Sequence, residues 1–131
     1  MKSFVRLAFL MACLPLGTAI AGDFDGSKPL ICAPVEAKAC SSGGDDCDSE
    51  LPADAGVPAF FRVDFAKKTI VGPKRTTPIQ LMEKGDNQLL LQGTELGFGW
   101  SLALNSADGT MAGTILNRDG VVVLFGSCTP L

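Results

Sequence analysis

The stretch from residue 88 to residue 128 limits the fold more than any other, because strand-like apolar segments alternate there with short turns. These segments cover residues 88–95, 100–105, 111–117 and 121–128. Loops that contain glycine separate them, and two of these loops end in Asp108-Gly109 and Asp119-Gly120. Asp-Gly pairs favour the positive φ angles of tight hairpin turns. The stretch therefore predicts an antiparallel β-meander.

Further strand signals precede the meander, at residues 28–35, 60–65, 68–72 and 77–83. In the second of these, Phe61, Val63 and Phe65 would share one face of the strand. Arg62 and Asp64 would occupy the other face, which indicates a half-buried strand. Helix signals are weak beyond the first 21 residues. The best of them, over residues 48–55, contains a proline and no apolar stripe, so we expect one turn at most.

Eight strands connected in this way would leave two exposed sheet edges, and closing the sheet into a barrel removes both. We therefore expect an all-β fold with disulfides, built as a small antiparallel up-and-down barrel of about eight strands. Barrels of this size are either filled by their own side chains or hold one small ligand, and the sequence leaves both alternatives open.

The first 21 residues have the layout of a secretory signal peptide. Lys2 and Arg6 precede an apolar run over residues 7–16, and Ala-Ile-Ala at residues 19–21 has small residues at the two positions that a signal peptidase recognises. The apolar run is shorter than the roughly 20 residues that a membrane-spanning helix needs. We expect cleavage after Ala21, which leaves residues 22–131 as a single β domain without a membrane span. Lipidation of Cys13, in a segment that loosely resembles a lipoprotein box, is the alternative.

The charge balance disfavours nucleic acid as a partner. Cleavage removes two of the eleven basic residues and none of the fourteen acidic ones, so the remaining chain has a net charge of −5. Nucleic-acid binding needs clustered Lys and Arg, and anionic membrane surfaces attract basic segments. We therefore expect neither partner.

Four cysteines remain after cleavage, and in an exported chain they predict a disulfide framework with three alternative pairings. The chain has no histidine and no Cys-x-x-Cys, so the usual zinc and thioredoxin-like motifs are absent, and we expect no metal and no cofactor. In an up-and-down barrel the first strand begins where the last one ends. This geometry favours Cys32 with Cys128, and it leaves Cys40 with Cys47 as a local bridge.

Residues 38–58 differ from the rest because they show no apolar period and are rich in acidic residues. They predict a long acidic surface loop, tied at its base by the local bridge. Its candidate binding residues are Asp45, Asp46, Asp48 and Glu50. Their oxygens are suitable ligands for calcium, but the spacing departs from the EF-hand pattern, so a solvated loop is the simpler interpretation.

Few catalytic arrangements are open to a chain that lacks both histidine and tyrosine. A pair of carboxylates could act as in glycosidases, which place two acids about 5–9.5 Å apart. Asp64 and Glu95 are the candidates, although charges on the outer face or at the end of a strand are ordinary. We therefore expect no catalytic residues.

Two further features are compatible with either a binding role or a purely structural role. Trp100, the only tryptophan, could line a ligand cavity or simply pack in the core. Lys74 and Arg75 form a small basic loop that faces either an acidic partner or water.

Several short motifs carry a resemblance to other proteins. They are Asp-Gly-Ser at residues 25–27, Leu-Ile-Cys at 30–32, Arg-Val-Asp-Phe at 62–65, Gly-Trp-Ser-Leu at 99–102 and Phe-Gly-Ser-Cys-Thr at 125–129. Together they resemble a group of small exported bacterial proteins with no known activity. The resemblance implies a bacterial exported protein and transfers no catalytic residue. In shape alone, the chain is also similar to periplasmic inhibitors of lysozymes and proteases.

From these observations we expect a noncatalytic, monomeric β-barrel in the periplasm or secreted medium of a bacterium. Exposed loops on rigid β scaffolds commonly carry recognition, so we expect surface loops to bind an envelope or secreted protein, or a small ligand. The alternatives are an inhibitor of a secreted hydrolase, a carboxylate-dependent carbohydrate-active enzyme and a lipocalin-like carrier.

Overall fold

The computed structural model describes residues 23–44 and 46–131. The expected signal peptide, Cys13 and Asp45 lie outside the described residues. The described part of the chain is all-β, and it forms one antiparallel sheet without a helix. Its strands are β1 (Leu30–Ser41), β2 (Cys47–Glu50), β3 (Phe61–Asp64), β4 (Thr69–Val71), β5 (Thr76–Pro78), β6 (Leu81–Lys84), β7 (Gln88–Glu95), β8 (Phe98–Asn105), β9 (Thr110–Asn117) and β10 (Gly120–Pro130).

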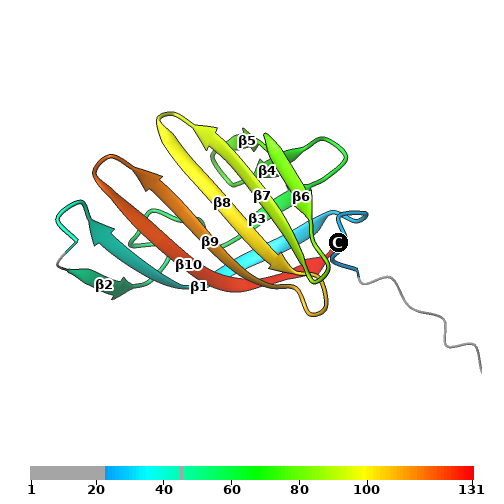
Figure 1. Cartoon of the computed structure of the whole chain (residues 1–131), viewed down its shortest axis with the longest axis horizontal. Coiled ribbons are helices and arrows are strands. Elements are labelled where there is room, and N and C mark those ends of the chain that lie inside the picture. The colour runs from blue at the N-terminus through cyan, green and yellow to red at the C-terminus, as the bar shows by residue number, and fades with distance from the viewer. Residues whose placement is uncertain (1–22, 45) are drawn as a thin grey trace, which may run out of the picture.

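Nine of the strands curl into a half-barrel in the order β5-β4-β3-β1-β10-β9-β8-β7-β6, and β2 pairs with β1 beside this path (Figure 1). The run from β7 to β10 is the predicted meander. The path begins and ends on consecutive strands that only Ile79 and Gln80 separate. Ile79 N–H donates to Lys68 O at 2.8 Å, and Gln80 N–H donates to Gln92 O at 2.9 Å. One continuous segment therefore bonds to both ends of the curled sheet.

The first and last long strands lie side by side, as closure of the sheet predicted. β1 pairs with β10 from Leu30 opposite Pro130 to Ser41 opposite Gly120. Cys32 lies opposite Cys128 and is bonded to it, and Cys40 is bonded to Cys47, its direct partner on β2. Both predicted disulfide pairings are confirmed.

The expectation of a loop over residues 38–58 was wrong for two parts of that range. β1 continues to Ser41, and Cys47–Glu50 forms a strand against it. Pairing with β10 and β2, together with the bridge at Cys40, imposes strand geometry on residues that show no apolar alternation. Turns occupy the range after β2, where Val57 N–H donates to Pro52 O at 2.8 Å.

The segment expected as one strand over residues 77–83 is divided into β5 and β6. The division has a topological cause, because the first part pairs with β4 and the second part with β7. The change of partner falls at Ile79 and Gln80, and the buried Ile79 side chain packs into the core there.

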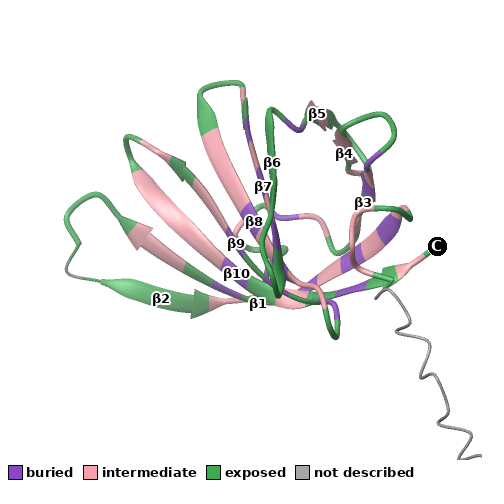
Figure 2. Ribbon diagram, turned by 45° about the vertical axis from the view of Figure 1, so that its right-hand side comes forward, coloured by how far each residue is buried: buried purple, intermediate pink, exposed green. Residues whose placement is uncertain are grey.

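Buried side chains form two separate clusters on the concave side of the sheet. The main cluster joins β1, β3 and β7–β10 and consists of Leu30, Cys32, Val63, Phe65, Ile79, Leu89, Leu91, Leu102, Leu104, Met111 and Cys128. A smaller cluster consists of Ala37, Val57 and Leu124. Figure 2 shows the buried positions on these strands, whereas β2 is mostly exposed. The core is therefore not one continuous block.

The Asp-Gly turn before β9 is fixed by local hydrogen bonds and by a close aromatic contact. Asp108 accepts hydrogen bonds from the Thr110 backbone N–H at 2.9 Å and from its hydroxyl at 2.7 Å. The backbone bond, followed by the hydroxyl bond, holds the pKa of Asp108 below its ordinary value. Gly109 has a φ of 75°, and a Cβ there would collide with the ring of Phe24. Phe24 thereby packs against the main cluster from the N-terminal side.

Candidate functional site

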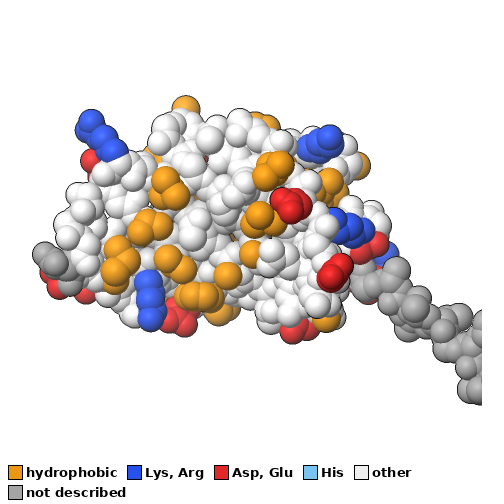
Figure 3. Space-filling view, viewed as in Figure 1, with side chains coloured by type: hydrophobic (Ala, Val, Ile, Leu, Met, Phe, Trp, Pro, Cys, Tyr) orange, Lys and Arg blue, Asp and Glu red, His pale blue; other side chains and the backbone are white. Residues whose placement is uncertain are grey.

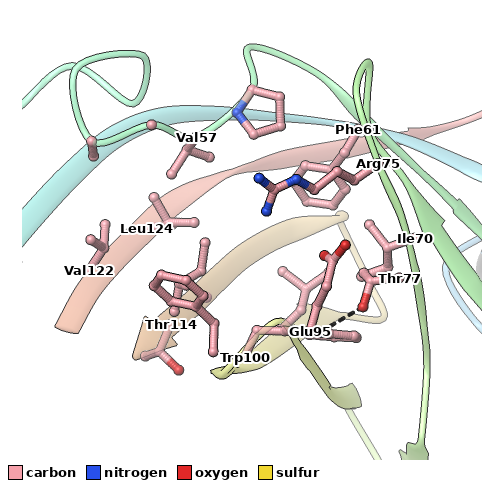
Figure 4. A pocket seen from close by; sticks show the side chains of 18 of the residues that line it. Val57, Phe61, Ile70, Arg75, Thr77, Glu95, Trp100, Thr114, Val122 and Leu124 are labelled. Carbon is pink, nitrogen blue, oxygen red and sulfur yellow. Dashed lines mark hydrogen bonds between the residues drawn. The ribbon is translucent and has the colours of Figure 1, made fainter. Parts of the chain in front are cut away.

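A pocket of about 910 Å³ lies on the concave side of the sheet, between the two core clusters (Figure 4). Its volume falls within the roughly 300–1,000 Å³ that is typical of small-molecule sites. Most of its lining is apolar, and the larger apolar side chains are Val57, Phe61, Ile70, Phe98, Trp100, Leu102, Met111, Ile115, Val121, Val122 and Leu124. The structure thus places a large apolar recess beside Trp100.

The floor of the pocket follows from the register of five strands. One row across the sheet aligns Gly93, Trp100, Ile115, Val122 and Ala39 on β7, β8, β9, β10 and β1. Side chains on one face of a sheet recur every second residue, so the next row on that face lies two residues along each strand. It aligns Leu91, Leu102, Gly113, Leu124 and Ala37. Gly93, Leu91 and Ala37 do not line the pocket themselves, and the small residues Ala39 and Gly113 leave space above the rest of the floor.

Trp100 belongs to the core and to the pocket at once. Its half-buried side chain packs against the main cluster and lines the pocket. The indole covers Gly93, where a Cβ would collide with the ring. Its Nε1–H donates to Thr77 Oγ1 on β5 at 3.3 Å, so the ring is held in place from the opposite wall. The two interpretations of Trp100 from the sequence are therefore compatible.

Two segments without strand structure form the outer walls. One follows β2 and carries Val57, which is 5% exposed and packs with the smaller cluster. The other is the tight turn between β4 and β5, which Gly72 N–H closes by donating to Arg75 O at 2.7 Å. A Cβ at Gly72 would lie 3.8 Å from the ring of Pro58, so the two walls approach each other there.

The charged lining residues of the pocket are Lys74, Arg75 and Glu95. Lys74 and Arg75 are exposed on the β4–β5 turn, and Glu95 is half-buried at the end of β7. Figure 4 shows the side chains of Arg75 and Glu95 extending into the space above the apolar floor. Within the described chain, none of the three has an oppositely charged partner within 4.0 Å.

The predicted acidic residues do not form part of this pocket. Asp46, Asp48 and Glu50 lie on β2 and the hairpin tip before it, and none of them lines the recess. Among the described residues, no group of three or more His, Cys, Asp or Glu side chains is arranged to hold a metal ion. The structure gives these residues no common site.

The two candidate catalytic carboxylates occupy different environments. Asp64 accepts a hydrogen bond from Lys67 N–H at 3.0 Å and so stabilises the turn after β3. Glu95 lines the large pocket, and Asp64 does not. The structure therefore does not bring them together in one cleft.

A smaller hollow of about 360 Å³ lies where the N-terminal segment meets β6. Asp25 accepts a hydrogen bond from Ser27 N–H at 2.9 Å and lies 3.9 Å from Lys84 Nζ. The hydrogen bonds from Ser27, with a weaker contribution from Lys84, lower the pKa of Asp25. The contact with Lys84 links the N-terminal segment to β6.

The outer surface is a weaker candidate for a binding site than the pocket. On the face seen in Figure 3, apolar side chains lie in small groups among backbone atoms and other side chains. Scattered apolar residues of this kind are normal on a protein surface.

Sequence reasoning named Trp100, Glu95 and the Lys74-Arg75 loop, but it missed most of the apolar lining. Val57, Ile115 and Val122 are ordinary strand or loop residues in the sequence. Alternation predicts which side chains on β9 and β10 point inward, but it does not tell a packed interior from an open one.

Comparison of the chain with protein families, curated proteins and solved structures found no significant match. In the part of the chain that the structure describes, no helix is long and apolar enough to cross a membrane. The two disulfides fit an oxidising compartment. The pocket is therefore the feature of this chain that bears most on its function.

Proposed function

We propose that this is a noncatalytic binding protein that holds a small apolar ligand in the concave pocket. The observation that carries the proposal is the recess of about 910 Å³ that separates the two core clusters. Protein interiors are close-packed and contain few voids larger than a water molecule. This recess instead presents apolar side chains to water, so a ligand that covers them would gain from removing that apolar surface from water.

The composition of the lining supports a ligand rather than a macromolecular partner. Pockets for small molecules are concave and mostly apolar, with a few polar groups that orient the ligand. Here the polar groups include Thr77, Arg75 and Glu95, and the floor is aliphatic and aromatic. Among the functions considered from the sequence, this arrangement favours the carrier over binding through the acidic loop.

The place of action is part of the same proposal. The signal-like first 21 residues and the resemblance to exported bacterial proteins support the periplasm or the secreted medium. Both disulfides are consistent with that compartment.

Titration with Nile red, a neutral apolar dye, tests the proposal on the purified exported protein with both disulfides formed. We expect saturable emission at one dye per chain, together with a change in the fluorescence of Trp100, the only tryptophan. Ala39→Phe should fill part of the floor and weaken binding at least about tenfold, which corresponds to roughly 1.4 kcal/mol.

Ala112→Phe is the matched control. Ala112 is also an alanine on a strand, but it is exposed and does not line the pocket. We expect its dye affinity to stay close to that of the unchanged protein. Absence of saturable binding, or equal weakening by both substitutions, would overturn the proposed function.

A further inference from the structure

We infer that the ligand is an amphiphile with an anionic headgroup, whose headgroup binds at Arg75 and whose apolar body lies along the apolar floor that Trp100 helps to form. This inference rests on the proposed function and adds the chemical class of the ligand. It follows from where charge lies around the pocket, from the shape of the charged groups and from the lack of internal partners for them.

Charge lies at one part of the pocket only. The charged lining residues come from the β4–β5 turn and from the end of β7. The part of the pocket formed by Val57, Val122 and Leu124 is apolar, and Figure 4 shows these three side chains on the side away from Arg75. A ligand that matches both parts must have a charged end and an apolar body.

The sign of the headgroup follows from the balance of charges. Lys74 and Arg75 contribute two positive charges and Glu95 one negative charge, so these three residues, here called the rim, carry a net positive charge. The whole chain carries a net charge of −3, so the rim differs in sign from the molecule. A local positive field concentrates anions at the mouth of a cleft.

Arg75 is the group best suited to hold the anion. A guanidinium presents a planar fork of donors that matches the oxygens of a carboxylate or phosphate. The hydrogen bond between Gly72 N–H and Arg75 O fixes the turn from which this side chain extends. Within the described residues, no carboxylate lies within 4.0 Å of its nitrogens, so the fork is not occupied by an internal ion pair.

Glu95 has the opposite effect to Arg75 on an anionic headgroup. Its carboxylate extends into the same space as Arg75 (Figure 4) and must repel an anionic headgroup there. Removing that charge should therefore strengthen the binding of anions. A ligand with a cationic headgroup would show the reverse.

The test is displacement of Nile red by four amphiphiles whose straight chains each contain twelve carbon atoms, used below their micellar concentrations. Dodecanoate and dodecyl phosphate distinguish a carboxylate from a phosphate, while dodecanol and dodecyltrimethylammonium supply neutral and cationic comparisons. We expect both anions to bind about tenfold more tightly than dodecanol, a preference that added salt should weaken. The cation should bind most weakly.

Substitutions at the rim assign this preference to its residues. Arg75→Gln should reduce the affinity for both anions to that for dodecanol and leave dodecanol unchanged, whereas Glu95→Gln should raise anion affinity severalfold. Arg62→Gln is the matched control, because Arg62 is exposed on β3 and does not line the pocket.

Failure of the headgroup inference can be distinguished from failure of the proposed function. If Nile red binds and Ala39→Phe blocks it, but anions and dodecanol bind equally or the cation binds best, the binding function stands and the headgroup inference is wrong. If neither dye nor any amphiphile binds, both are wrong.

Discussion

Single residues decide how closely the walls of this pocket can approach each other. Gly93 allows the Trp100 indole to lie against β7, and it also allows the carbonyl of Pro78 to approach from β5. Neither contact is visible in the sequence, where Gly93 is simply a glycine within an apolar strand. The Asp-Gly pairs were easier to interpret. Gly109 has the expected positive φ, whereas Gly120 is required because a Cβ there would collide with the carbonyl of Cys40.

Gly93→Ala should destabilise the protein by about 1–3 kcal/mol, the typical cost of forcing extra atoms into a packed site. The added methyl would collide with the Trp100 ring and with the Pro78 carbonyl. Urea unfolding, followed by circular dichroism, measures the change.

Gly99→Ala provides the control on the neighbouring strand. A Cβ at Gly99 meets only the Leu116 side chain at 3.8 Å, an ordinary contact distance. We expect its free energy of unfolding to remain within about 0.5 kcal/mol of the unchanged protein, as for most surface substitutions. Equal losses for the two variants would contradict the close contact at Gly93.

Strands whose own sequence alternates apolar and polar residues could be predicted. Strands that are held in place by pairing with their neighbours could not. β7 to β10 alternate inward and outward side chains, and short turns join them, so the meander was evident. β2 is a polar segment, Cys-Asp-Ser-Glu, and is a strand because β1 and the Cys40 bridge hold it in register. The change of partner between β5 and β6 depends on the curvature of the whole sheet, which no local pattern encodes.

The two disulfides should differ in their contribution to stability. Cys32 and Cys128 are 96 residues apart in sequence and buried, whereas Cys40 and Cys47 are 7 apart and more exposed. In the chain-entropy model, closing the longer loop stabilises by about 4–5 kcal/mol and closing the shorter one by about 2–3 kcal/mol. Replacing Cys32 and Cys128 together by alanine should therefore lower the Tm more than replacing Cys40 and Cys47.

Differential scanning calorimetry of the two double variants, beside the unchanged protein, gives this comparison directly. Alanine is preferred to serine because Cys32 is fully buried, and a hydroxyl there would lack a hydrogen-bond partner. Similar Tm values for the two variants would show that the seam between β1 and β10 is held mainly by its backbone pairing and side-chain packing.

At the scale of the whole molecule, the fold class followed from the sequence, but the pocket did not. Strand count, edge closure and cysteine placement all indicated a curled sheet with β1 beside β10, and the structure agrees. The size of the space inside depends on how far two distant wall segments stand from the floor. That distance is set by the turns after β2 and β4, whose sequences contain no inward and outward period.

A protein that keeps an apolar recess open should gain stability when the recess is filled. Nile red at about one hundred times its Kd should raise the free energy of unfolding by about 2.7 kcal/mol. Ala39→Phe should raise the Tm without ligand while it weakens binding, since cavity-filling substitutions commonly stabilise at the expense of function.

Thermal unfolding of the unchanged protein, Ala39→Phe and the Ala112→Phe control, each with and without dye, separates these effects. A lower Tm for Ala39→Phe in the absence of dye would indicate that the floor at β1 is already close-packed. A dye-induced shift of equal size in all three proteins would place the dye outside the pocket.

The bond between Cys32 and Cys128 makes most of this polypeptide a covalent ring. A protease that cuts once in the coil between β2 and β3 opens the ring but releases nothing, because the fragment that contains Cys32 stays attached to the one that contains Cys128. A nicked molecule would keep all of its residues and its pairing of β1 with β10 until a reductant reached that buried bond. In any compartment that contains proteases, a cut in this pocket wall would therefore leave the two fragments covalently joined, whereas noncovalent contacts alone would hold the fragments of a chain without this bond.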